Sequence, residues 1–224
     1  MERIGLSTGW RIVCGAWMAG VIAAAFIGVG PAAGFREPEA ARILFFHVPV
    51  AWLAVLGFLG ATFHAARYLR RRNPAADIRA LASAEMGFLF CVLATLSGAL
   101  FARVQWGAAW NWDPRQTSIV ALLLVYAAYF TLRSAVAEPE RRAALSAVYA
   151  IVATLPMLFL VFILPRVVES LHPADTVRSG GMSPDYRIVF FAALGAFTLL
   201  YLWIYRLRVA VGELERIACR HSMK

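Results

Sequence analysis

Six runs of apolar residues, each close to twenty residues long, constrain this chain more than any other feature of its sequence. A helix of about 20 residues crosses the apolar core of a bilayer. Apolar residues make up 61% of the 224 residues and charged residues only 16%, too few charges for the surface of a soluble domain. We therefore predict an all-α, polytopic membrane protein with six transmembrane helices, at residues 12–30, 43–66, 80–102, 114–132, 143–165 and 188–205.

The basic residues predict the orientation of these helices. Fifteen of the 22 Lys and Arg residues fall in the two termini and in the loops after the second and fourth runs, and seven fall elsewhere. Cytoplasmic segments of membrane proteins carry the excess of positive charge. We therefore expect both termini in the cytoplasm and the loop after the third run at the outer face. The first run is long for the core of a cleavable signal peptide, so we interpret it as a retained helix.

Charge and cysteine patterns exclude several classes of protein. The net charge is +9, but the basic residues are spread over helix ends and form no single basic face, which argues against nucleic-acid binding. The three cysteines are not placed to form a disulfide at the outer face, and the sequence has no Cys-x-x-Cys-His motif for covalent haem attachment. With no internal repeat and no separate soluble segment, residues 1–224 are predicted to form one integral membrane domain.

A tryptophan-rich loop at about residues 103–117 connects the third and fourth runs. Trp106, Trp110 and Trp112 fall within seven residues. If a helical turn covers the first two, their rings lie on one side and Trp112 points elsewhere. Asp113 before Pro114, with Gln116 three residues after Asp113, is a capping-box pattern and predicts that the fourth helix begins at Pro114.

Two histidines are predicted to lie at the same face as this loop. His47 is about one turn inside the second run, and His172 follows a short apolar stripe at residues 167–171 that suggests an interfacial helix. Imidazoles on two sides of a flat aromatic surface are suited to hold haem iron, and arginines pair with haem propionates. The candidate arginines are Arg103, Arg115, Arg166 and Arg178.

Each of these residues also has a simpler interpretation. Tryptophans at a membrane edge are usually interface anchors, Asp113 is explained as a helix cap, and Arg115 as a side chain that extends to the interface. His64 lies seventeen residues after His47, about 25 Å along the helix, so these two cannot share a ligand. Near the opposite face, His64 and Glu85 are explained by packing or solvation.

The motif Trp106-Gly107…Trp110-x-Trp112-Asp113-x-Arg115-x-Thr117-Ser118 resembles the haem exporter protein C (CcmC) family of cytochrome c maturation. The upstream Phe46-His47-Val48-Pro49-x-Ala51-Trp52 and the downstream Leu171-His172 also match, and the resemblance covers most of the chain. The family belongs to a wider haem-handling group with a tryptophan-rich "WWD" domain, which includes CcmF and CcsA. Ala109 stands where many members have a large aromatic residue, and Pro114 is shared more with the longer sibling synthases.

The resemblance implies a function at the periplasmic face of the bacterial inner membrane. His47 and His172 would be the axial ligands of haem b, and Trp106, Trp110, Trp112, Asp113 and Arg115 would complete the site. The protein would be a haem-presenting platform and not an enzyme, working with the ATP-binding cassette subunits CcmA and CcmB and the small membrane protein CcmD. It would load haem onto the chaperone CcmE for cytochrome c maturation.

Two alternatives remain open from the sequence. A membrane b-type cytochrome that exchanges electrons with quinone would need histidine pairs at matching depth inside the bundle, where only His64 is available. A permease that moves haem across the bilayer would need a polar or aromatic path, which the largely uninterrupted apolar runs do not indicate.

Overall fold

A computed structural model describes residues 7–32, 35–172 and 181–222 of the chain. Six helical segments in this part of the chain are long and apolar enough to cross a membrane, as the sequence predicts. The first four crossings are α1 (Thr8–Ala23) with the π-turn η1 (Ala24–Gly28), the 3-10 turn η2 (Pro38–Ile43) with α2 (Leu44–Arg71), α3 (Pro74–Trp106) and α4 (Pro114–Ala135). The fifth comprises α5 (Pro139–Val152), α6 (Thr154–Leu158), η3 (Phe159–Ile163) and α7 (Leu164–Val167), and the sixth is α8 (Pro184–Ser222).

Several helices extend beyond their apolar runs because local caps, and not hydropathy, set where they begin. The third, fourth, fifth and sixth crossings each begin at a proline. Proline has no backbone N–H, and in the first helical turn an N–H would have no acceptor within the helix. The side chain of Asn73 caps α3 by accepting from the Ala75 N–H, and Glu138 caps α5 in the same way. The third helix therefore covers residues 74–106, whereas the apolar run covers only 80–102.

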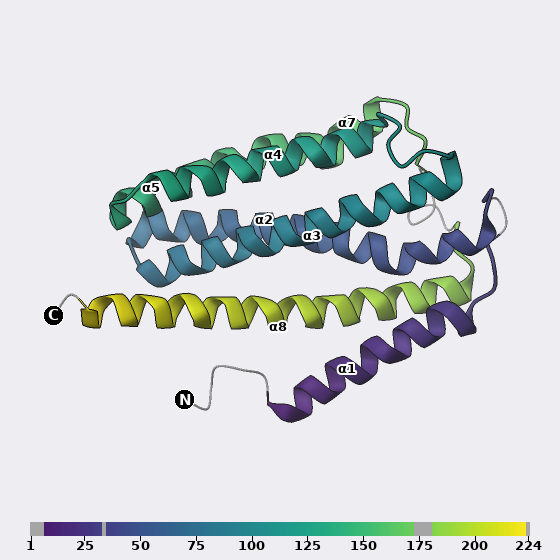
Figure 1. Ribbon diagram of the computed structural model, residues 1–224, viewed down its shortest axis with the longest axis horizontal. Coiled ribbons are helices and arrows are strands. Elements are labelled where there is room, and N and C mark those ends of the chain that lie inside the picture. The colour runs from purple at the N-terminus through teal and green to yellow at the C-terminus, as the bar shows by residue number, and fades with distance from the viewer. Residues whose placement is uncertain (1–6, 33–34, 173–180, 223–224) are drawn as a thin grey trace.

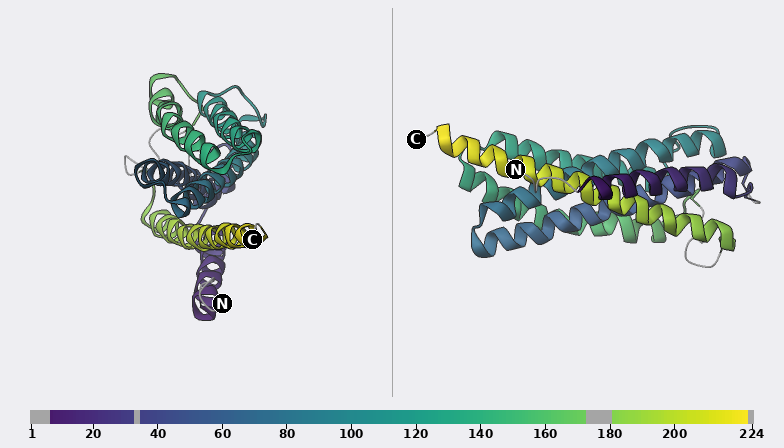
Figure 2. Two further views of the ribbon diagram at one scale, coloured as in Figure 1. Left: turned by 90° about the vertical axis from the view of Figure 1, so that its left-hand side faces the viewer. Right: turned by 90° about the horizontal axis from the view of Figure 1, so that it is seen from below.

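The helices pack in layers (Figures 1 and 2). α4 and α5 lie on one side of the central pair α2 and α3, α8 lies on the other side, and α1 lies outermost against α8. The central pair is very close at Gly57, where an added Cβ atom would lie 2.5 Å from the backbone nitrogen of Gly87. Phe58 stacks on Tyr126 of α4 at 3.6 Å between ring centroids, which ties the central pair to the α4 layer.

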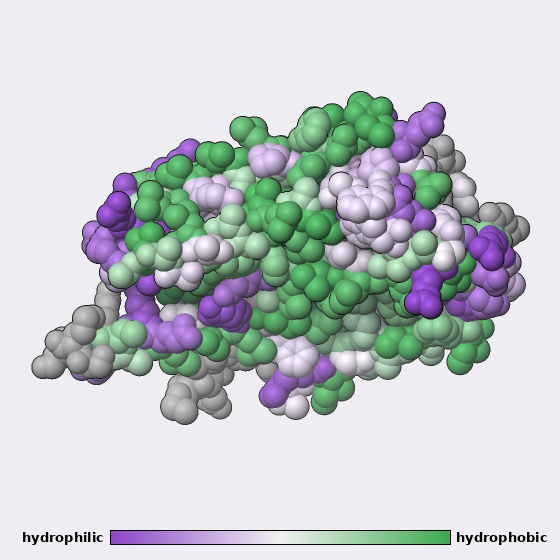
Figure 3. Space-filling view, turned by 45° about the horizontal axis from the view of Figure 1, so that its top comes forward, coloured by the Kyte–Doolittle hydropathy of each residue, from purple (hydrophilic) through white to green (hydrophobic). Residues whose placement is uncertain are grey.

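The surface has the distribution expected of a membrane protein (Figure 3). Apolar residues cover most of the middle of the face shown, and hydrophilic residues gather toward its two ends. The start of α1 and the end of α8 lie toward one end of the bundle (Figure 1). The tryptophan-rich loop lies at the other end, which we call the loop end.

Candidate functional site at the loop end

The tryptophan-rich loop is shorter than predicted and is held by its own polar groups. α3 ends at Trp106 because Gly107 adopts the left-handed conformation, with φ of 85°, and α4 begins at Pro114. The Gln116 side chain accepts from the Asn111 N–H at 2.9 Å and donates to the Ala109 carbonyl at 3.0 Å. The loop conformation is therefore set from the first turn of α4.

Two local predictions about this loop were wrong. Trp106 and Trp110 do not share a helical turn, because Gly107 ends the helix between them. The capping box is incomplete: Asp113 caps α4 as predicted, accepting from the Arg115 N–H at 2.9 Å, but the Gln116 side chain binds Asn111 and Ala109. Gln116 therefore holds the loop and does not reach back to the backbone N–H of Asp113.

Asp113 connects the loop to the segment that follows α7. Its carboxylate is buried, with a side-chain exposure of 1%. It accepts hydrogen bonds from the Leu171 N–H at 2.7 Å and from the Ser170 hydroxyl at 3.0 Å, and its Oδ1 lies 3.2 Å from Nδ1 of His172. A carboxylate only accepts, so His172 donates from Nδ1 and keeps the lone pair of its Nε2.

These contacts overturn the prediction of an interfacial helix at residues 167–171. α7 ends at Val167, and Val168 is extended. In a helix the Leu171 N–H would point at a carbonyl of the preceding turn, whereas here it reaches Asp113, 58 residues earlier in the chain. The apolar stripe therefore does not determine the conformation of this segment; the buried carboxylate does.

The charges of this cluster follow from its burial and its hydrogen bonds. Burial by itself would raise the pKa of Asp113, but the hydrogen bonds from Leu171, Arg115 and Ser170 outweigh it and hold the pKa below its usual value. Burial holds the pKa of His172 below its usual 6.5, against the opposing effect of Asp113 and with a smaller contribution from Arg115. At pH 7 the site therefore combines a charged carboxylate with a neutral imidazole.

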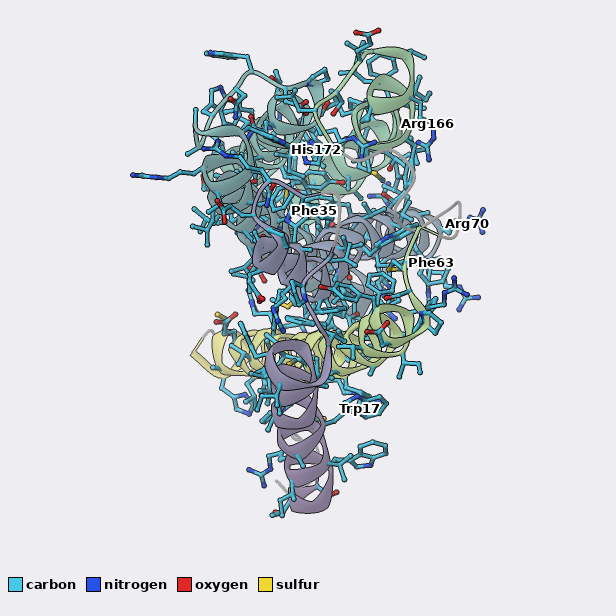
Figure 4. All side chains as sticks on the ribbon, turned by 90° about the vertical axis from the view of Figure 1, so that its right-hand side faces the viewer. Trp17, Phe35, Phe63, Arg70, Arg166 and His172 are labelled. Carbon is cyan, nitrogen blue, oxygen red and sulfur yellow. The ribbon has the colours of Figure 1, made fainter. Side chains whose placement is uncertain are left out.

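An aromatic series continues from His172 across the loop end to Phe35, and Figure 4 labels these two residues. The ring centroids of His172 and Trp106 are 5.1 Å apart in an edge-to-face arrangement, Trp106 packs on Phe101 at 5.6 Å, and Phe101 on Phe35 at 6.2 Å. Trp112 differs from Trp106. It is 77% exposed and contacts Trp110 edge-to-face at 5.7 Å. Only Trp106 of the three tryptophans is therefore seen in ring contact with His172.

His47 lies on α2 toward the same end. Its Nδ1 is 2.9 Å from the Ser97 hydroxyl on α3, and its ring is close enough to His172 for the two to interact electrostatically. The structure thus places both predicted histidines at the loop end, on segments 125 residues apart in the chain. Ser97 and Ser170 were missed in the sequence, because a serine inside an apolar run or a loop carries no local signal of its partner.

The candidate arginines separate into different environments. Arg115 is near Asp113, His172 and Arg166, and its Nε is buried with no hydrogen-bond partner among the described residues. Arg166 donates to the Phe162 carbonyl and lies at the loop end, to one side of His172 (Figure 4). Arg103 is exposed, and Arg178 lies outside the described residues. Arg115 and Arg166 carry two positive charges, and Asp113 carries one negative charge that is already hydrogen-bonded. The remaining positive charge is suited to an anionic group.

His64 and Glu85 lie away from this end, and their contacts are structural. Nε2 of His64 is 3.3 Å from the Tyr205 hydroxyl, and the His64 ring packs edge-to-face on Phe63. Glu85 pairs with Arg208 of α8, with Oε1 accepting from Nη2 at 2.9 Å and Oε2 lying 2.6 Å from Nε. This ion pair fastens α8 to α3.

Fold and site together define the class: a multi-pass helical membrane protein with an aromatic, imidazole-containing site at one end of its bundle. The chain belongs to the family described as heme exporter protein C, whose model matches residues 5–223. Heme exporter protein C of Bradyrhizobium diazoefficiens is 34% identical over 173 residues, which cover 76% of this chain and 66% of that relative. The Paracoccus denitrificans protein of the same name is 30% identical over 195 residues, covering 83% of this chain and 81% of the relative.

A shorter match extends to a second group of proteins. The cytochrome c biogenesis protein CcsA of a Synechococcus strain is 38% identical over 76 residues, which cover 34% of this chain and 25% of that protein. The family resemblance drawn from the tryptophan, aspartate and histidine motifs is therefore confirmed, and so is the fold.

Proposed function

We propose that this protein handles haem for cytochrome c maturation, by holding haem between His47 and His172 at the loop end and presenting it to the chaperone CcmE. The relatives are named for haem export and cytochrome c biogenesis, which supports the general role. The observation that carries the specific proposal is the convergence of two histidines at one end of the bundle. The buried carboxylate of Asp113 holds His172 there through Nδ1, which leaves the lone pair of Nε2 available.

The residues around the histidines fit haem as a cargo. Trp106 offers an aromatic surface beside His172. The Nε of Arg115, which has no partner among the residues that the structure describes, offers a donor for a propionate. Haem as the cargo would supply two groups. Its iron would bind the two imidazoles, and its vinyl group would be the site of attack by a chaperone. The role of this chain is then to bind its cargo, to orient it and to leave one edge of it exposed. We assign none of its residues a chemical step.

Partners and orientation are part of the same proposal. Following the distribution of basic residues, the loop end would face the periplasm across a bacterial inner membrane, with CcmA, CcmB and CcmD as the associated subunits. The exposed Trp112 is then a surface on which a partner or lipid can pack. Haem b is the expected form of the cargo.

Absorption spectroscopy of the purified full chain with added haem tests the proposal. We expect a six-coordinate, bis-histidine spectrum in the wild type, loss of one ligand in His47→Ala and in His172→Ala, and no change in the matched control His64→Ala. Capture of haem by CcmE should fail in the first two variants only. A spectrum that is unchanged in both variants, or normal CcmE loading by His172→Ala, would refute the assignment.

A further inference from the structure

The ring of His47 lies against two small residues of α3. Its Nδ1 is 2.9 Å from the hydroxyl oxygen of Ser97. An added Cβ atom on the neighbouring Gly98 would lie 3.1 Å from Cε1 of the His47 ring, so the ring would have to shift by a few tenths of an ångström to make room for a larger residue. These two residues, which we call the α3 seat, therefore fix the position of the ring from one side.

The hydrogen atoms of the α3 seat can be assigned from its acceptors. The Ser97 hydroxyl carries a single hydrogen, and its oxygen is 2.7 Å from the Leu93 carbonyl and 3.2 Å from the Ala94 carbonyl, which can only accept. The contact with the Leu93 carbonyl is the shortest of the three, so we assign the hydroxyl hydrogen to it. We therefore assign the hydrogen between Ser97 and His47 to Nδ1 of the histidine.

We propose that Ser97 and Gly98 are positioning residues: Ser97 holds His47 in its Nδ1–H tautomer, Gly98 leaves room for the ring, and together they present the Nε2 lone pair to haem iron. This inference deepens the proposed function and rests on it. In a neutral imidazole the nitrogen opposite the N–H is the one that binds metal, and the partner of the N–H decides which nitrogen that is. Asp113 fixes the same tautomer in His172, so both rings offer the equivalent atom.

Nitrogen NMR tests the tautomer without any haem. The full chain is labelled with ¹⁵N-histidine and studied without haem, in detergent, at a pH where the ring is neutral. Long-range couplings between the ring nitrogens and protons distinguish Nδ1–H from Nε2–H. The signal that disappears in His47→Ala belongs to His47. We expect the Nδ1–H form in the wild type, although free neutral histidine favours Nε2–H. The Nε2–H form should gain population in Ser97→Ala, whereas Ser97→Thr, which keeps a hydroxyl, should retain the wild-type form.

The matched control is Thr95→Ala. Thr95 lies on the same helix, and its hydroxyl makes the same kind of backbone hydrogen bond, to the Cys91 carbonyl at 2.8 Å. Loss of a partner that orients a metal-binding histidine weakens metal affinity by about 10- to 100-fold. We therefore expect haem affinity to fall about tenfold in Ser97→Ala and to be unchanged in Ser97→Thr and Thr95→Ala. Gly98→Ala, which displaces the ring without removing its hydrogen bond, should also lower the affinity.

The outcomes separate this inference from the function on which it rests. An Nε2–H tautomer in the wild type, or an unchanged tautomer in Ser97→Ala, would overturn the role of the α3 seat while leaving haem binding by His47 intact. If haem affinity is the same in His47→Ala as in the wild type, the proposed function is overturned. The presentation of Nε2 to iron is then overturned as well, even if the Nδ1–H tautomer is observed.

Discussion

Replacing Asp113 with Asn tests how the site is held together, since it keeps the size of the side chain and removes its charge and one acceptor oxygen. Oδ2 accepts from the Leu171 N–H at 2.7 Å, and Oδ1 accepts from the Arg115 N–H at 2.9 Å. An amide has only one oxygen, so in either orientation one of these backbone N–H groups faces an NH₂ group. If the helix cap is kept, the bond to Leu171 is lost.

The size of the effect follows from that one hydrogen bond. A hydrogen bond to a charged group contributes about 1.5 to 3 kcal/mol, and a loss of about 2 kcal/mol corresponds to about 30-fold in an equilibrium constant. The conformation in which residues 170–172 are bound to Asp113 is the one that places His172 at the site in the structure. The apparent affinity for haem should therefore fall by up to about 30-fold.

Two measurements on the purified protein in detergent check this prediction. Haem titration followed by absorption gives the affinity, and hydrogen exchange at the Leu171 amide reports whether that segment is still bound. Asp185→Asn is the matched control, since it makes the same charge change on an exposed residue at the start of α8. Wild-type affinity together with slow Leu171 exchange in Asp113→Asn would refute the argument that this carboxylate organises His172.

Three other perturbations follow from the structure. Arg208→Met leaves the half-buried Glu85 without its partner and should destabilise the protein by about 1 to 3 kcal/mol in detergent unfolding, and adding Glu85→Gln should restore most of the loss; equal unfolding of the single and double variants would contradict this. Gly57→Ala places a Cβ atom 2.5 Å from the backbone of α3 and should lower the thermal midpoint markedly, whereas Gly15→Ala, with nothing within 4 Å, should not. Trp112→Ala should reduce haem capture by CcmE without altering the ferric spectrum, because its exposed ring has no contact with His172; a changed spectrum would place it at the iron.

Much of the fold could be predicted from the sequence because its signals are local. The number of crossings follows from the length of the apolar runs, and the start of α4 follows from Asp113 and Pro114 in adjacent positions. The boundaries of the other helices were less accurate, since caps such as Asn73 lie in polar segments that hydropathy does not mark. The candidate histidines and tryptophans could also be predicted, because residue type and the family motif point to them.

The arrangement of the site was decided by the tertiary structure. The sequence by itself determined that Asp113 is a helix cap and that His47 and His172 come near one face. Only the packed bundle brings Asp113 to the Leu171 N–H and the Ser170 hydroxyl, and Ser97 to His47, across 50 or more residues of chain. A hydrogen bond between distant segments depends on how the helices pack, and a carboxylate or a serine looks the same in the sequence whether or not a partner will reach it.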